Sequence, residues 1–137
     1  MTLNYRAAIL TVAWLSLIYW LSSLPDLSTV EDAPVLRIVS NLMHVPIFAV
    51  LAFCCLKTIV TPRSSWKAYV IAAVITASYA VVDEWHQSFV PGRVGSVSDV
   101  LVDLASAWGL LLLLWWRTFN QRIQSDSEPG TARTWAN

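Results

Sequence analysis

Charged residues are scarce in this chain. They make up 13% of its 137 residues, against about 25% in an ordinary soluble domain, and the formal net charge is zero. A chain without a basic excess has no field that would draw it to DNA or RNA, so we expect no nucleic-acid partner. Hydrophobic residues reach 56%, which indicates a membrane protein whose first partner is the lipid bilayer.

Residues that bind metals or act as nucleophiles are also few, with two cysteines and two histidines. Cys54 and Cys55 are adjacent, so on a helix they point in different directions and are poorly placed to form a disulfide. We interpret them as small buried apolar residues. The sequence has no H-E-x-x-H, no G-x-S-x-G and no clustered Cys/His pattern. We therefore predict no cofactor and assign no metal.

Long apolar stretches predict an all-α integral membrane bundle of four transmembrane helices. The expected helices cover residues 7–24, 40–58, 66–87 and 98–117. Each approaches the ~20 residues that cross a ~30 Å hydrocarbon core. Pro46 should kink the second helix or delay its start, because it cannot donate to the carbonyl four residues earlier. Residues 1–122 would form the transmembrane domain, and the polar residues 123–137 a disordered cytoplasmic tail.

The basic residues orient this bundle. Seven of the nine would lie on one side of the membrane, namely Arg6, Lys57, Arg63, Lys67, Arg117, Arg122 and Arg133. The other side would hold Arg37 and Arg93. Because segments rich in Lys and Arg stay in the cytoplasm, we predict a multi-pass protein with both termini cytoplasmic.

Polar residues gather at the opposite, extracytoplasmic end. If the helices alternate in direction, this end collects the beginning of the second helix, the end of the third and the beginning of the fourth. The candidate ligand-binding residues there are His44, Asp83, Glu84, Gln87, Arg93, Asp99 and Asp103. A charge at the centre of a membrane helix costs about 2.5–3.5 kcal/mol on insertion scales. These side chains should therefore lie at the membrane boundary or face the protein interior.

Helical spacing refines this candidate site. Gln87 follows Asp83 by four residues and Glu84 by three, so it can neighbour either one. Asp99 and Asp103 are four apart and should face the same way. In a low-dielectric setting such a pair of acids needs a cation, or one of them keeps its proton.

Several of these residues also have a structural interpretation. Ser96-Val97-Ser98-Asp99 fits a helix capping box, and Val90-Pro91-Gly92-Arg93 has the Pro-Gly order of a type II turn. Arg93 would suit a phospholipid head-group anchor. His44 would suit a hydrogen-bonded interfacial histidine, and His86 an ordinary exposed residue.

The combined motifs resemble those of the VanZ-like membrane protein family. They are Asn41-x-x-His44, Asp83-Glu84-x-x-Gln87-x-Phe89-Val90-Pro91-Gly92-Arg93 and Asp99-x-x-x-Asp103. The similarity covers roughly residues 10–117, although the family usually carries Asn at the position of Asp103. The family is named for a protein linked to resistance to the lipoglycopeptide teicoplanin. The resemblance implies a place in the cell envelope, which we take to be the bacterial inner membrane.

Three hypotheses about function follow. In the first, the site recognises or processes an amphiphilic envelope ligand, either a lipid-linked cell-wall intermediate or a lipoglycopeptide-type antibiotic. Arg93 would hold a phosphate or carboxylate, and the acids with His44 would hold a cation or exchange protons. In the second, the protein is a hydrolase or transferase acting on a lipid head group, with His44 and Glu84 as acid and base. In the third, the polar cluster fixes the bundle or docks a partner, such as a second copy in a homo-oligomer.

Overall fold

The structure, a computed structural model, describes residues 2–25, 34–60 and 66–127. Residues 34–44 are described in their backbone alone, so the side chain of His44 lies outside the described part. Within these ranges the chain forms four helices, α1 (Tyr5–Ser22), α2 (Pro34–Thr58), α3 (Trp66–Gln87) and α4 (Val97–Ser127). Two short strands, β1 (Thr2–Leu3) and β2 (Ile59–Val60), pair antiparallel. The all-α prediction is confirmed.

Two helices are longer than the sequence predicts. Helix α2 begins at Pro34 instead of near residue 40, which fits the preference of proline for the first position of a helix. Helix α4 continues ten residues beyond the expected end at 117. No Gly or Pro interrupts residues 110–128, and the polar residues that follow Arg117 are compatible with a solvated helix. The first five residues of the expected tail are therefore helical, and the rest of it lies outside the described residues.

Pro46 does not delay the start of α2. The helix includes Pro46 and extends on both sides of it. One nearby carbonyl has an additional donor from another helix, because the Ser106 hydroxyl of α4 donates to the carbonyl of Val45. Neighbouring helices and serine side chains commonly satisfy backbone groups around a proline in membrane helices.

Burial follows the pattern of a membrane protein. The interior contains small residues from all four helices, Ala7, Ala52, Ala68, Ala72, Ala80 and Ala107. Large apolar side chains point outward, including Ile9 and Leu10 of α1 and Leu112 of α4. Small residues let helices approach closely where lipid surrounds them. Helices α1, α3 and residues 97–125 of α4 are long and apolar enough to cross a membrane, and α2 has a shorter apolar part, Val45–Thr58.

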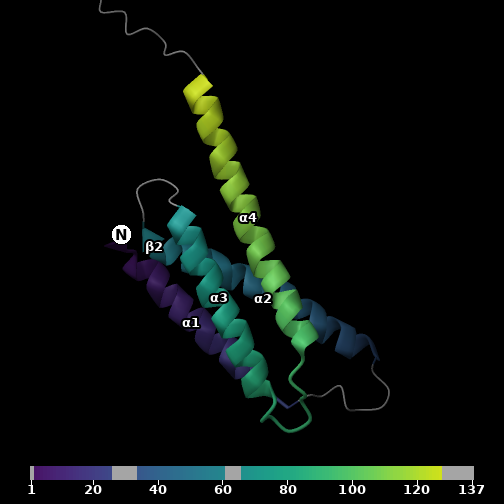
Figure 1. The fold of residues 1–137 in the computed structure, drawn as a ribbon. Helices are drawn as coiled ribbons and strands as arrows, with labels where there is room; N and C mark the ends of the chain where they lie inside the picture. The colour runs from purple at the N-terminus through teal and green to yellow at the C-terminus, as the bar shows by residue number, and fades with distance from the viewer. Residues whose placement is uncertain (1, 26–33, 61–65, 128–137) are drawn as a thin grey trace, which may run out of the picture.

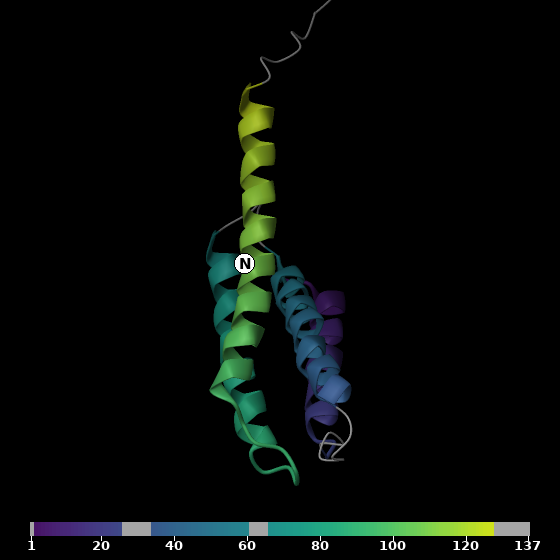
Figure 2. The same ribbon diagram turned by 90° about the vertical axis from the view of Figure 1, so that its right-hand side faces the viewer.

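Helix α2 crosses behind the other helices and holds them together. In Figure 1 it runs obliquely behind α3 and α4 to end near the beginning of the chain. The indole N–H of Trp14 in α1 donates to the carbonyl of Ile47 in α2 at 3.0 Å. The hydroxyls of Thr11 and Thr58 are 2.9 Å apart at the far end of the same pair. Figure 2 shows α4 extending well past the other three helices.

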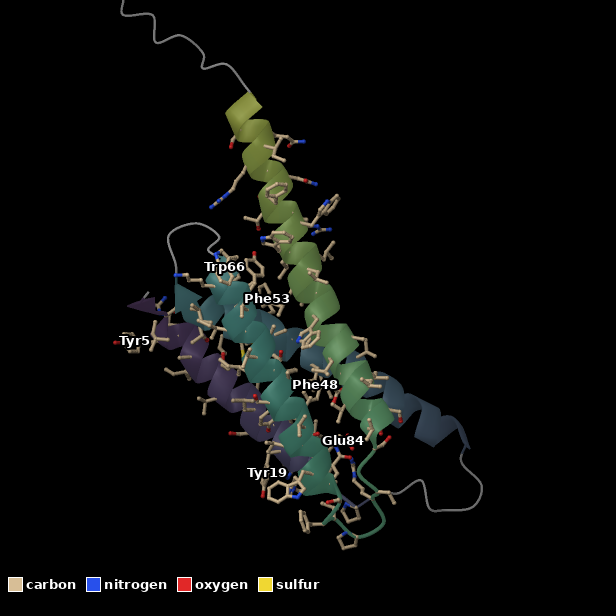
Figure 3. The ribbon with its side chains drawn as sticks, in the orientation of Figure 1. Tyr5, Tyr19, Phe48, Phe53, Trp66 and Glu84 are labelled. Carbon is tan, nitrogen blue, oxygen red and sulfur yellow. The ribbon has the colours of Figure 1, made fainter. Side chains whose placement is uncertain are left out.

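The end of α1, the end of α3 and the beginning of α4 lie together at one end of the bundle, the lower end in Figure 1. Figure 3 labels Tyr19 and Glu84 at this end, and Tyr5 and Trp66 toward the opposite one. We call the first the polar end. The helical order thus brings together the segments on which the sequence places the acids of α3 and α4.

Candidate functional site

The last two turns of α3 turn a polar face inward. Asp83, Glu84 and Gln87 are each no more than 5% exposed, whereas their neighbour Trp85 is 65% exposed. Helical spacing places Asp83 and Gln87 on one face of α3, since they are four residues apart. Glu84 points in a neighbouring direction and reaches the beginning of α4. Burial of three polar side chains is unfavourable unless each finds a partner. The loop after α3 and the beginning of α4 supply partners.

Gln87 links the carboxylate of Asp83 to the guanidinium of Arg93. Its side-chain N–H donates to Oδ2 of Asp83 at 2.9 Å, and its carbonyl oxygen accepts from Arg93 at 3.0 Å. An amide can do both at once because it carries a donor and an acceptor. The sequence predicted that Gln87 could neighbour either acid, and the structure gives the bond to Asp83.

Arg93 also closes the end of α1. Its Nε donates to the carbonyl of Leu24 at 3.0 Å, and a terminal nitrogen donates to that of Leu21 at 3.5 Å. A cation at the C-terminal end of a helix is favoured by the helix dipole. With the bond to Gln87, three of the five guanidinium N–H groups are directed at protein oxygens.

The turn that positions Arg93 has the predicted geometry. The backbone N–H of Arg93 donates to the carbonyl of Val90 at 3.1 Å, and Gly92 has φ 80°. A positive φ at the third position, after a proline at the second, is the pattern of a type II turn. The prediction for residues 90–93 is confirmed.

Glu84 contacts the beginning of α4. Its Oε2 accepts the backbone N–H of Ser96 at 2.8 Å. In a capping box the acid at Asp99 would accept that N–H, so the structure gives this role to a residue of another helix. An acid at a helix N-terminus is favoured by the dipole. This contact offsets the unfavourable position of Glu84 near the C-terminal end of α3.

The two acids of α4 differ in depth. Asp99 lies in the first turn and is partly buried, and its backbone N–H donates to the carbonyl of Ser96 at 3.1 Å. Asp103, one turn further along, is fully buried. The spacing of four residues places them on one side of α4 as expected, with only Asp103 deep in the bundle.

His86 contacts α1. Its ring stacks on that of Tyr19 with centroids 4.5 Å apart, and its Nε2 lies 3.0 Å from the hydroxyl of Ser23. A further link lies deeper in the bundle, where the hydroxyl of Tyr79 donates to the carbonyl of Leu15 at 2.7 Å. These contacts fix the separation of α1 and α3 at the polar end.

A cavity of about 370 Å³ lies between these two helices at the polar end. We call it the aromatic cavity. Its lining residues are Tyr19, Tyr79, Val82, Asp83, Trp85, His86 and Phe89. Rings therefore form most of the wall among the residues that the structure describes, and Asp83 is the acidic residue among them. A second cavity of similar volume lies between α3 and α4, and the described residues that line it include Trp66, Trp108 and Trp115 but none with a charge.

Residues 4–120 match the model of the VanZ/LLP1 family, which is most of the chain. The chain belongs to the VanZ/LLP1 family. It is thus a VanZ-like membrane protein, in a family associated with antibiotic resistance. The resemblance seen in the motifs is confirmed. No curated protein and no solved structure matches the chain.

The VanZ-like motif residues lie together where their surroundings are described. Asp83, Glu84, Gln87 and Arg93 meet at the polar end with the beginning of α4. The backbone of His44 lies within α2, and the position of its side chain is not described. Among the described residues, no three His, Cys, Asp or Glu side chains are arranged to hold a metal ion.

Sequence reasoning missed part of this VanZ-like site. The sequence patterns do not point to Tyr19 or Tyr79, and they predict that His86 is an ordinary exposed residue. A signal for two of them was present, because Tyr79, Asp83 and His86 follow the helical spacing of one α3 face. Tyr19 belongs to another helix, and its place opposite His86 depends on how α1 and α3 pack.

Proposed function

We propose that this VanZ-like protein binds the head group of an amphiphile in the aromatic cavity. The site would lie at the extracytoplasmic boundary of the bacterial inner membrane, with both termini in the cytoplasm. The aromatic cavity is the observation that carries the proposal. It combines exposed interfacial rings with a buried acid beside the motif residues.

The position of the cavity suits a ligand that is partly in the membrane. Trp85 and Phe89 are 65% and 69% exposed, and their rings pack edge to face with centroids 5.5 Å apart. Tryptophan side chains such as Trp85 gather at the level of lipid head groups. A ligand with an acyl chain can keep the chain in lipid while its head group enters between α1 and α3.

The volume of the cavity narrows the class of ligand. About 370 Å³ is at the small end of the ~300–1,000 Å³ of ligand pockets. It suits the head of a lipid-linked cell-wall intermediate or another lipid, and only a side group of a lipoglycopeptide-type antibiotic. An effect on antibiotic resistance would then follow from binding a lipid of the envelope.

Under this proposal one motif residue contacts the ligand and the others position the helix ends. Arg93 and Glu84 hold the ends of α1 and α4 through their bonds to backbone groups. Asp83 lines the cavity and is held by Gln87. We therefore assign ligand contact to Asp83 and positioning to Gln87, Glu84 and Arg93. Three of the guanidinium N–H groups already donate to protein oxygens. This favours a positioning role for Arg93 over binding of a phosphate.

Photo-crosslinking tests the proposal. A phospholipid with a diazirine on its head group should label the peptides that contain Tyr19 and residues 79–89 in membranes. Trp85→Leu should lower labelling several-fold by removing one wall of the cavity. Trp115→Leu, which alters the apolar cavity between α3 and α4, is the matched control and should leave it unchanged. Equal labelling of all three proteins would refute a site in the aromatic cavity.

A structural role for the polar end is the second candidate. The bonds that Arg93 and Glu84 make to the ends of α1 and α4 favour it. In that case lipid labelling would not depend on Trp85, while substitutions in the polar end would still lower stability.

A further inference from the structure

We propose that the head group bound in the aromatic cavity is a lipid-borne ammonium, with trimethylammonium as the best fit. This inference rests on the function proposed above and names its ligand class. Two observations carry it, the rings of the wall and the charge of its acidic group.

The rings offer surfaces that attract a cation. Two ring pairs line the cavity, Tyr19 with His86 and Trp85 with Phe89. The edge-to-face arrangement of the second pair presents rings in two different planes. The faces of Trp and Tyr carry negative quadrupole charge, and walls built of such rings are the means by which proteins bind quaternary ammonium groups.

The charge of the lining supports a cation over an anion. Asp83 is among the lining residues, and those that the structure describes include no Lys or Arg. The bond from Gln87 is made to Oδ2, and a carboxylate has about four acceptor sites. Asp83 can therefore face a cation while it holds Gln87. A phosphate or sulfate would be repelled by the same carboxylate.

The position of the cavity at the membrane favours an ammonium carried by a lipid over a free amine. The cavity opens among side chains that are themselves exposed to the surroundings of the bundle, Trp85, Phe89 and Val82. Apolar surroundings contribute about 0.8 kcal/mol per buried CH₂ of an acyl chain. A chain-bearing ammonium is therefore expected to bind far more tightly than choline.

The test uses three probes on the full chain in uncharged maltoside micelles. They are tetradecyltrimethylammonium, its uncharged isostere with a 3,3-dimethylbutyl head, and tetradecyl sulfate. The readout is competition with the diazirine phospholipid for crosslinking to the cavity peptides. We expect the ammonium probe to compete about tenfold better than the isostere, and the sulfate to compete least. Choline serves as the chain-free probe and should compete only at much higher concentration.

Variants assign the effect to the cavity. Asp83→Asn keeps the shape and should remove most of the preference for ammonium over the isostere. Trp85→Leu, at an exposed position, should weaken the ammonium probe about fivefold even if Asp83→Asn fails to fold. Trp115→Leu is the control and should change neither the preference for ammonium over the isostere nor the strength of competition by the ammonium probe.

The possible failures can be told apart. Equal competition by all three chain-bearing probes, lost in Trp85→Leu, would overturn the ammonium preference and keep the amphiphile site. Stronger competition by the sulfate probe would also overturn the ammonium preference, would keep the amphiphile site and would indicate an anionic head group. Choline competing as well as the chain-bearing ammonium would overturn a lipid source. No competition by any probe would count against both the inference and the proposed function.

Discussion

Gly95→Ala should give the largest loss of stability of any small substitution in the polar end. A Cβ at Gly95 would lie 2.6 Å from the backbone carbonyl oxygen of Glu84 and 3.4 Å from Cβ of Ser88. A backbone oxygen in the last turn of α3 cannot move aside cheaply, so the loop must shift. That shift would also stretch the bond from Ser96 to Glu84. We expect a loss of about 3 kcal/mol, seen as a fall of about 10 °C in the thermal midpoint in detergent.

The other glycines supply controls. A Cβ at Gly109 would meet no neighbouring element within 4 Å among the residues that the structure describes, so Gly109→Ala should leave the midpoint unchanged or raise it slightly. Gly92 has φ 80°, so Gly92→Ala should cost about 1–2 kcal/mol through backbone strain. A midpoint for Gly95→Ala equal to that of Gly109→Ala would show that the loop does not pack against α3 as described.

Gln87→Leu should give the second large effect. The change removes the donor to Asp83 and the acceptor for Arg93 and puts an apolar side chain of similar size in their place. A buried acid then loses a hydrogen bond, as does a guanidinium. Truncating one partner of a bond to a charged group costs about 1.5–3 kcal/mol, and here two such bonds are lost. We expect a loss of about 3 kcal/mol and weaker lipid crosslinking in the aromatic cavity.

Gln121→Leu is the matched control, because Gln121 is exposed on the polar part of α4. It should change the free energy of unfolding by less than about 1 kcal/mol. If Gln87→Leu is no worse than Gln121→Leu, Gln87 does not bridge the acid and the guanidinium. If Gln87→Leu lowers stability without changing crosslinking of the remaining folded protein, the structural candidate gains over ligand binding.

Much of the fold was accessible from the sequence because its signals are local. Apolar length and the breakers around each stretch predicted α3 with its bounds, 66–87, and α1 within two residues. The Pro-Gly order predicted the turn at 90–93, since a type II turn favours proline at its second position and needs a residue that tolerates positive φ at its third. The predicted end of α4 was wrong, because a loss of hydrophobicity marks the membrane boundary and not the end of a helix.

The contacts between helices were not accessible in this way. Ser96, a partner of Glu84, lies twelve residues further along the chain at the start of α4, although Asp99 offered a capping box for the same N–H. The partners of Arg93 at the end of α1 lie about seventy residues away in the chain. Both choices depend on how the helix ends pack, which single-helix patterns do not encode. The aromatic cavity was missed for the same reason, because its rings come from two helices and a loop.

The side of the membrane on which the polar end lies decides which ligands can reach it. Single cysteines introduced as Val94→Cys and Lys67→Cys, in a background with Cys54→Ala and Cys55→Ala, report the two ends. Val94 is 87% exposed between α3 and α4, and Lys67 is exposed at the start of α3. An impermeant thiol reagent applied to intact cells should label Val94→Cys and leave Lys67→Cys unlabelled until the cells are opened. The reverse pattern would place the aromatic cavity at the cytoplasmic boundary and contradict an extracytoplasmic ligand.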